Sequence, residues 1–259
     1  MKSVALTIAG SDPSGGAGIQ ADLKTFHQFG VYGEAVITLL TVQNTLRVDR
    51  VVTLDPELVV EQIRALLEDI PPQAVKVGAL GKASLVRAVA VVALDFHCPL
   101  VVDPVMISKH GAPLIAAEAT HVLVKDLIPR AFLVTPNLHE ATALTGLEVN
   151  DVGGMRAAAM RMLEMGAHAA LIKGGHLAGT AMDVLFDGRD WYEFPAERIL
   201  TEHTHGTGCT YSAAITAGLA LGMPLVDAVA RAKRYITAAI LSNPGLGHGS
   251  GPVNHHAQA

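Results

Sequence analysis

The chain has 259 residues, half of them hydrophobic, which is enough to bury a sizeable core in one large or two small domains. Charged residues make up 17% and aromatic residues 4%, a composition that excludes intrinsic disorder and suits tight packing of helices on a sheet. The net charge of −5, with no basic block, argues against a nucleic-acid partner.

Apolar runs alternate with helix-like segments along most of the chain. The expected strands are Val4–Ala9, Ala35–Val42, Ala74–Val77, Leu100–Val102, Ala131–Thr135 and Ala169–Ile172. The helix-like segments between them are Ala17–Phe29, Glu57–Glu68, Ser84–Asp95 and Gly154–Met165. Strands that are continuously apolar and separated by helices predict an α/β fold whose parallel sheet is covered on both faces.

The last third of the chain has a different pattern. A hairpin, and so an antiparallel edge to the sheet, is predicted where Ala181–Phe186 is followed by Asp187-Gly188 and then by Asp190–Phe194. Two apolar helices are expected at Thr210–Leu221 and Leu225–Leu241. Because no internal repeat and no linker-like Ser/Pro run occurs, residues 1–259 are predicted to form one domain. Its tail, 243–259, is rich in Gly and His, a composition compatible with loose order.

The cysteines and one uncharged stretch bear on the protein's location. Cys98 and Cys209 lie far apart, and no charged-then-apolar leader is visible, so we expect neither a disulfide scaffold nor secretion, but a reducing cytoplasm. The uncharged stretch from Gly206 to Val226 is interrupted by glycines and Pro224, and its helical part is too short to cross a bilayer. No membrane partner is expected.

Ligands of open α/β sheets bind beyond the carboxyl ends of the strands, so the loops there are the candidate sites. The first of these loops leads into Gly16-x-Gly18-x-x-Ala21, a degenerate dinucleotide fingerprint. The next strand ends at Gln43-Asn44, without the acidic residue that a nicotinamide site needs, and no P-loop motif occurs. Asp22 is either a charge near a helix N-terminus or a hydrogen-bond acceptor for a ligand.

The strongest local signal is the segment from His203 to Cys209, HTHGTGC, directly before the uncharged helix. Gly206 and Gly208 would let the backbone approach an anion, while free N–H groups of the first helical turn point at it. Because Cys209 lies in this first helical turn, its thiol is predicted to have a lowered pKa and could then act as a base or nucleophile. The alternatives are a tight turn with a buried cysteine, and a zinc site of His203, His205 and Cys209, which lacks a fourth ligand.

Polar residues follow three further strands. Asn137 and Glu140 share one face at the start of a helix and could position a hydrated magnesium ion, although an Asn N-cap with Glu three residues on is the simpler explanation. Lys173, in Lys173-Gly174-Gly175-His176, could reach a phosphate, or it could be a solvated lysine at a strand end. Asp103-Pro104-Val105-Met106 is the third of these segments.

Taken in order, these segments resemble the hydroxymethylpyrimidine/phosphomethylpyrimidine kinases of thiamine biosynthesis, in the ribokinase-like superfamily. The matching segments are 9–25, 43–45, 103–106, 135–137, 173–176, 203–209 and 247–255. The resemblance implies a three-layer αβα fold and a homodimer. It also implies MgATP-dependent phosphorylation of an aminopyrimidine alcohol, and then of its monophosphate to the pyrophosphate.

The resemblance gives roles to residues on the substrate side. Gly10, Asp22 and Gln43 would hold the pyrimidine, and Val105 would contribute an apolar wall. The Gln43 amide suits this role because it donates and accepts at once. Ala79 stands where the family commonly has methionine, which leaves the breadth of substrates open.

It also gives roles to residues on the phosphate side. Asn137 and Glu140 would order magnesium and its waters, and Lys173 would face the ATP phosphates. The backbone of Gly206, Thr207 and Gly208 would cradle the transferred phosphoryl group. Cys209 stands where the wider superfamily has an aspartate base, and it would act as a base or as a positioner of the substrate hydroxyl.

Three other functions compete with this hypothesis. Pyridoxal kinase is the nearest, because relatives with the same Gly-Thr-Gly-Cys element resemble enzymes that phosphorylate the same kind of alcohol on another flat heterocycle. A nicotinamide-dependent oxidoreductase rests only on the degenerate fingerprint. A non-catalytic pyrimidine-binding protein would keep the fold, but the presence of Cys209, Glu140 and Lys173 together argues against it.

Overall fold

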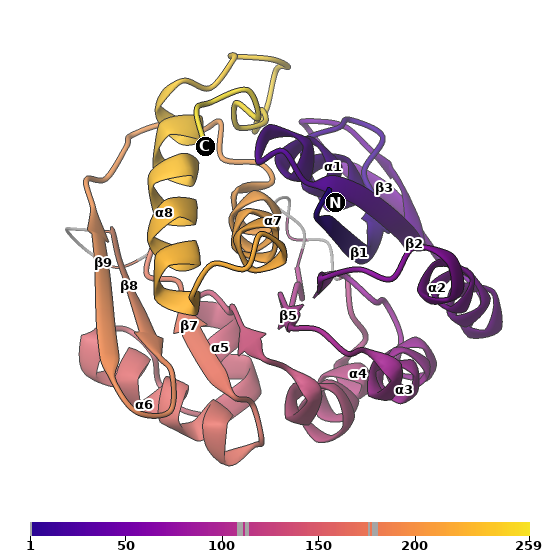
Figure 1. The fold of residues 1–259 in the computed structure, drawn as a ribbon. Coiled ribbons are helices and arrows are strands. Elements are labelled where there is room, and N and C mark those ends of the chain that lie inside the picture. The colour runs from indigo at the N-terminus through magenta and orange to yellow at the C-terminus, as the bar shows by residue number, and fades with distance from the viewer. Residues whose placement is uncertain (1, 108–110, 112–113, 176, 178–180) are drawn as a thin grey trace.

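A central sheet organises the computed structural model, which describes all residues except 1, 108–110, 112–113, 176 and 178–180. His176 of the lysine–glycine motif therefore lies outside the described residues. Within the described part the sheet has nine strands in the order β3-β2-β1-β4-β5-β6-β7-β8-β9 (Figure 1). The strands are β1 (Val4–Ser11), β2 (Tyr32–Gln43), β3 (Val48–Thr53), β4 (Ala74–Val77), β5 (Leu100–Val102), β6 (Leu133–Val134), β7 (Ala169–Ile172), β8 (Ala181–Phe186) and β9 (Trp191–Ala196).

The strands from β2 through β1 and β4 to β7 pair in parallel, and β8 and β9 form the antiparallel edge that the sequence predicts. The α/β fold class is thereby confirmed. A second antiparallel edge, β3 on β2, is not evident from the sequence, because charged Asp49 and Arg50 interrupt its valines. The turn between these strands is closed by the Asn44 carboxamide, which accepts hydrogen bonds from the N–H groups of Leu46 and Arg47.

Helices cover both faces of the sheet. They are α1 (Gly18–Gln28), α2 (Pro56–Asp69), α3 (Ala83–Val92), α4 (Ala117–Val122), α5 (Leu138–Thr145), α6 (Val152–Glu164), α7 (Thr207–Ala220) and α8 (Leu225–Leu241), with short helical turns at Ala93–Asp95, Leu123–Leu127 and Ile128–Arg130. Helices α1, α7 and α8 pack on one face, and α2 to α6 pack on the other (Figure 1).

Burial on both faces explains the continuous apolar strands. In β5, Leu100 and Val102 belong to the core under α2 to α6, whereas Val101 belongs to the core under α1, α7 and α8. Successive side chains point to opposite faces, so both sets must be apolar when both faces are covered. Helix α7 is buried from Thr210 to Ala220, because it lies between α1, α8 and the sheet, as expected of the uncharged stretch.

The C-terminal tail is ordered, so loose order, which its composition allows, is wrong. Val253, His255 and Ala257 are buried. The His205 N–H donates to the carbonyl of Gly251 at 3.0 Å, and the Tyr235 hydroxyl donates to the carbonyl of His255 at 3.0 Å. Long-range hydrogen bonds of this kind cannot be read from composition.

Among the described helices none is both long enough and apolar enough to span a membrane.

Candidate active site

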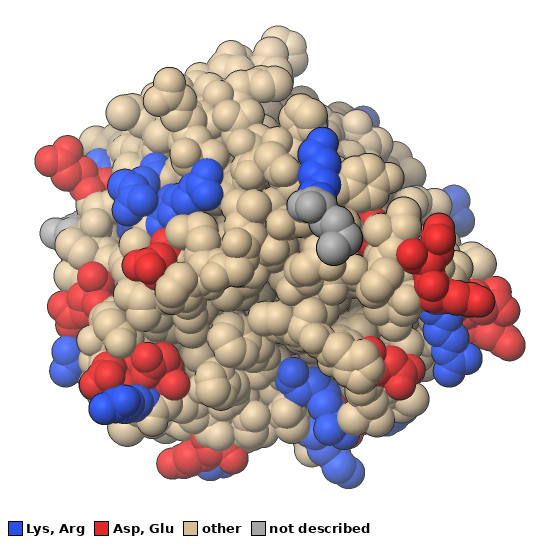
Figure 2. Space-filling view, in the orientation of Figure 1, with Lys and Arg blue, Asp and Glu red and all other residues tan. Residues whose placement is uncertain are grey.

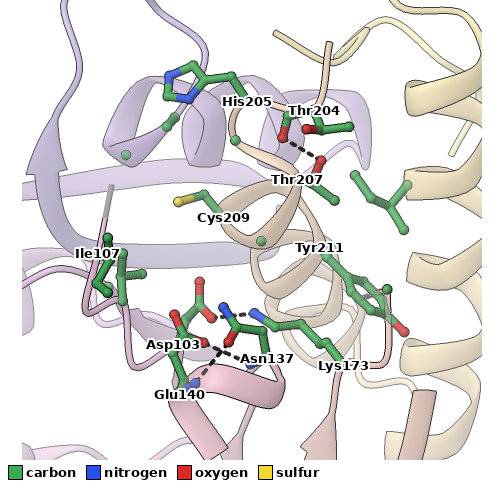
Figure 3. A pocket seen from close by; sticks show the side chains of 18 of the residues that line it. Asp103, Ile107, Asn137, Glu140, Lys173, Thr204, His205, Thr207, Cys209 and Tyr211 are labelled. Atoms are coloured by element: carbon green, nitrogen blue, oxygen red, sulfur yellow. Dashed lines mark hydrogen bonds and ion pairs between the residues drawn. The ribbon is translucent and has the colours of Figure 1, made fainter. Parts of the chain in front are cut away.

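A cavity of about 960 Å³ opens at the carboxyl edge of the parallel strands, which is within the usual range for small-molecule sites. Loops that follow β1, β4, β5, β6 and β7 reach this edge together because the strands are parallel. Ten predicted site residues line the cavity: Gly10, Gln43, Val105, Asn137, Glu140, Lys173, Gly206, Thr207, Gly208 and Cys209. Figure 3 shows Asp103, Asn137, Glu140 and Lys173 close together, beside the helix α7 that carries Thr207 and Cys209.

The backbone at the start of α7 is shaped by glycine. Gly206, the N-cap residue, has φ 78°, and a Cβ there would overlap the carbonyl oxygen of Gly16. The turn places Gly208 beside Lys173, whose Nζ would lie 3.4 Å from a Cβ on that glycine. Because the cap offers no side-chain acceptor, the helix end can donate to an anion in the cavity.

Two N–H groups of this turn are available for that purpose. The N–H of Thr207 reaches the carbonyl of Thr204, and that of Thr210 reaches the carbonyl of Gly206. The N–H groups of Gly208 and Cys209 have no backbone acceptor within the described part of the chain. The anion cradle stays a prediction, and these two N–H groups are the donors that it requires.

Lys173 faces the cavity in an ion pair. Its Nζ lies 2.8 Å from Oδ1 of Asp103, which also accepts from the Thr135 hydroxyl, and Oδ2 of Asp103 accepts from Ser212. Burial opposes ionisation of Asp103, but Lys173 and Lys76 hold the pKa of its carboxyl below the ordinary value. The Lys173 side chain is 12% exposed, so the alternative of a solvated lysine is wrong.

Asn137 and Glu140 form a capping box, which confirms the simpler explanation for their spacing. The Glu140 N–H donates to Asn137 Oδ1 at 2.9 Å, and the Asn137 N–H donates to Glu140 Oε2 at 2.8 Å. Burial and the charge of Asp103 nevertheless outweigh Lys173 and raise the pKa of Glu140 to about 7.

That raised pKa also bears on a metal. A carboxyl whose ionisation is disfavoured beside a cavity suits a divalent cation, which would stabilise the charged form of Glu140. Mg²⁺ commonly needs only one or two protein carboxylates, because water and phosphate oxygens complete its coordination. The residues present therefore fit a magnesium ion carried by a nucleotide.

Cys209 departs from the prediction. It lies in the first turn of α7, yet burial, with the charges of Asp22 and Asp103, outweighs Lys76 and the Gly18 N–H and raises the pKa of its thiol to about 11. The predicted lowering of this pKa is wrong. A helix end contributes only about 0.3–1 kcal/mol to an exposed charge, and loss of hydration around a half-buried thiolate is the larger effect here.

Asp22 lies behind the wall of the cavity and does not line it. It is 0% exposed, and its Oδ2 accepts from Thr7 at 2.6 Å and from Lys76 at 2.8 Å. Its Oδ1 is buried and has no partner among the residues described. Lys76 borders the cavity in its place. Sequence reasoning missed Lys76, because its contact with Asp22 joins β4 to α1 across 54 positions of the chain.

Sequence reasoning also missed two residues beside Gln43. His205 Nε2 lies 2.7 Å from Asp12 Oδ2 and 3.2 Å from the Gln43 side-chain nitrogen. Asp12 accepts from the Ser14 N–H in a turn that the sequence Asp-Pro-Ser-Gly favours. That turn motif is the signal in the sequence that could have identified Asp12. His205 was considered only as a zinc ligand, and the described residues contain no group of three His, Cys, Asp or Glu that could hold a metal.

The opposite end of the cavity is formed by α8 and the antiparallel edge. Lys233 Nζ lies 2.6 Å from Asp183 Oδ2, and Asp183 Oδ1 accepts from the Gly174 N–H at 2.9 Å. On the face shown in Figure 2, acidic and basic side chains are interspersed around the periphery. An anion would therefore be held by the helix end and by individual lysines rather than by a basic surface.

The chain is similar to known proteins over nearly its whole length. The family model for phosphomethylpyrimidine kinase matches residues 12–254. The hydroxymethylpyrimidine/phosphomethylpyrimidine kinase of Rhizobium meliloti is 48% identical over 98% of this chain and 97% of its own length. Thiamine biosynthesis bifunctional protein ThiED of Geobacter sulfurreducens is 51% identical over 96% of this chain, which spans about half (51%) of that relative. Pyridoxal kinase of Bacillus subtilis, solved with ADP, is 38% identical, with a TM-score of 0.91 over 99% of this chain and 98% of that one.

Proposed function

The chain belongs to the phosphomethylpyrimidine kinase family and is a phosphotransferase, and we propose that it phosphorylates 4-amino-5-hydroxymethyl-2-methylpyrimidine and then the resulting monophosphate, with ATP as donor. The observation that carries this proposal is one cavity in which the α7 N-terminus and Lys173 face Gly10 and Gln43 at the ends of β1 and β2. The proposal includes a single domain, a cytoplasmic homodimer, a small-molecule substrate, Mg²⁺ and no nucleic-acid partner.

In the first transfer the substrate hydroxyl oxygen forms a bond to the γ-phosphorus, and the bond from that phosphorus to the β–γ bridging oxygen breaks, releasing ADP. The hydroxyl proton passes to an oxygen of the transferred phosphoryl group. The N–H groups of Gly208 and Cys209 and the ammonium of Lys173 would stabilise the charge on the transferred group. Such a transfer depends mainly on positioning and electrostatics, and a cradle held rigid by Gly206 supplies both. Asp103 keeps Lys173 charged and in place.

A magnesium ion would be held by Glu140, and through water by Asn137, and would supply positive charge against the phosphates of the nucleotide. Glu140 is fixed for that purpose by the capping box, which uses its Oε2. Cys209 would position the substrate hydroxyl as a neutral thiol, because its raised pKa leaves little thiolate at neutral pH.

Pyridoxal is the second candidate substrate, because a pyridoxal kinase has the same fold over the whole chain. Release of ADP should be measured with the aminopyrimidine, its monophosphate and pyridoxal under identical conditions. We expect both pyrimidines to be phosphorylated with higher kcat/KM than pyridoxal. A dominant rate on pyridoxal would overturn the proposed substrate. If none of the three compounds led to release of ADP, the proposed activity would be overturned.

A further inference from the structure

His205 joins three segments that are distant in sequence. Its Nε2 faces both Asp12, in the loop after β1, and Gln43, at the end of β2, and its own backbone leads into α7. Asp12 and His205 are buried, with 4% relative exposure each, and Gln43 lines the cavity beside them. In this arrangement Asp12 can orient the His205 ring, and His205 can orient the Gln43 amide.

The proton on His205 Nε2 is determined by Asp12. The Asp12 carboxylate also accepts from the N–H groups of Ser14, Gly16 and Ala17 and from the Ser14 hydroxyl. Burial opposes its ionisation, but the hydrogen bonds from His205 and Ser14 hold the pKa of Asp12 below the ordinary value. An ionised carboxylate only accepts, so a nitrogen 2.7 Å from its oxygen must carry hydrogen.

The orientation of the Gln43 amide follows from that proton. An NH2 group 3.2 Å from His205 Nε2 would place two donors face to face. Rotation of the amide by 180° exchanges its oxygen and nitrogen without changing the space it fills. Oε1 then accepts from the same N–H that Asp12 accepts from, and the NH2 group is left for the cavity.

The His205 ring has little freedom to leave this position. A Cβ on Gly16 would lie 2.5 Å from its Cδ2, so the glycine loop packs directly against the ring. Its backbone is held by Gly251 and Val253 of the tail, with N–H···O distances of 3.0 and 3.4 Å. The ordered tail thereby supports the substrate side of the cavity.

We propose that Asp12 and His205 fix the Gln43 amide with its NH2 toward the substrate, so that the site selects a heteroaromatic ring with an unprotonated nitrogen as acceptor. His205 and Asp12 are then positioning residues, and Gln43 determines specificity. The inference rests on the proposed function for the identity of the ring, but not for the direction of the hydrogen bond.

The test compares His205→Gln, which keeps an N–H donor near the position of Nε2, with His205→Leu, which fills similar space without one. Each is assayed by ADP release on the aminopyrimidine and on two analogues in which one or the other ring nitrogen is replaced by CH. We expect the wild type to disfavour one analogue by about tenfold or more in kcat/KM, because the amide donor loses its acceptor. In His205→Leu this preference should fall to within about threefold, mainly through KM, and His205→Gln should restore it.

Gln43→Glu is a second variant, in case the leucine variant does not fold. It keeps an acceptor for His205 and removes the donor toward the ring, so it should also abolish the preference. A preference that persists in His205→Leu or in Gln43→Glu would overturn the inference while leaving the kinase function intact.

A wild type that does not phosphorylate the aminopyrimidine would overturn the proposed function instead. The orientation would then be judged by calorimetric binding of the same three heterocycles to wild type and Gln43→Glu, where equal affinities in the wild type would overturn it.

Discussion

Two lysine–aspartate pairs lie at the same region of the sheet, and in each the nitrogen and oxygen are 2.8 Å apart. Lys76 and Asp22 are both 0% exposed although Lys76 borders the cavity, whereas the Lys173 side chain is 12% exposed beside the α7 N-terminus. The Lys76–Asp22 pair, here called the sealed pair, cannot exchange partners without exposing a buried charge. Of the two, only the Lys173–Asp103 pair, the open pair, can turn its lysine toward an incoming phosphate. Equal geometry therefore supports stability in one pair and chemistry in the other.

Breaking the sealed pair should have the largest effect. Lys76→Met leaves Asp22 as an uncompensated buried carboxylate, and we expect a loss of about 3–5 kcal/mol in the free energy of unfolding at pH 7. Urea denaturation followed by circular dichroism measures it. The control Lys76→Met/Asp22→Leu removes both charges and should recover most of the loss. A single variant within about 1 kcal/mol of the wild type would show that the pair is not structural.

Breaking the open pair should instead affect turnover. Lys173→Met removes a cation from the phosphate cradle, and we expect kcat/KM to fall about 10²- to 10³-fold, as when one charge-stabilising donor is lost. Asp103 keeps Thr135 and Ser212 as donors, so stability should fall less than in Lys76→Met. Steady-state ADP release and urea denaturation of the same sample separate the two effects, and a reduction below tenfold would contradict the role of Lys173.

Glu34 extends the contrast to a buried carboxyl without a cation. It is 6% exposed, both oxygens lack a partner among the described atoms, and burial, then the charge of Asp69, raises its pKa to about 7. The folded state therefore binds the proton more tightly than the unfolded state. Stability should decline as pH rises from about 4.5 to 7, by on the order of 1–3 kcal/mol.

Glu34→Gln should remove this dependence. The variant should be more stable than the wild type at pH 8 and equal to it at pH 4.5, as measured by urea denaturation at both values. An equal difference at both pH values would show that Glu34 does not titrate in this range.

The smallest effect is expected at Cys209, whose pKa responds to charges of both pairs. If the neutral thiol only positions the substrate hydroxyl, Cys209→Ser should keep kcat within about tenfold of the wild type, whereas loss of a general base costs about 10²- to 10⁴-fold. The comparison of kcat for Cys209→Ser and Cys209→Ala at pH 7 measures this. A loss of kcat greater than about tenfold in Cys209→Ser would show that Cys209 acts as a general base.

Local sequence was sufficient for much of this protein. Apolar runs such as Ala74–Val77 and Leu100–Val102 coincide with β4 and β5, because strands buried on both faces have a composition that no surface segment has. The capping box at Asn137 and the glycine turn at Gly206 are likewise local, since they depend on residues a few positions apart. These features indicated where the cavity would lie.

The tertiary structure decided which charges meet and which groups water can reach. The partners Asp22 and Lys76 are 54 positions apart, and Asp103 and Lys173 are 70 apart, so no local pattern relates them. The same reason explains why the pKa of Cys209 was predicted in the wrong direction: a helix end is visible in the sequence, but burial by distant segments is not. Sequence determined the strands, the turns and the chemical groups, whereas packing determined their ionisation, because desolvation depends on everything that surrounds a charge.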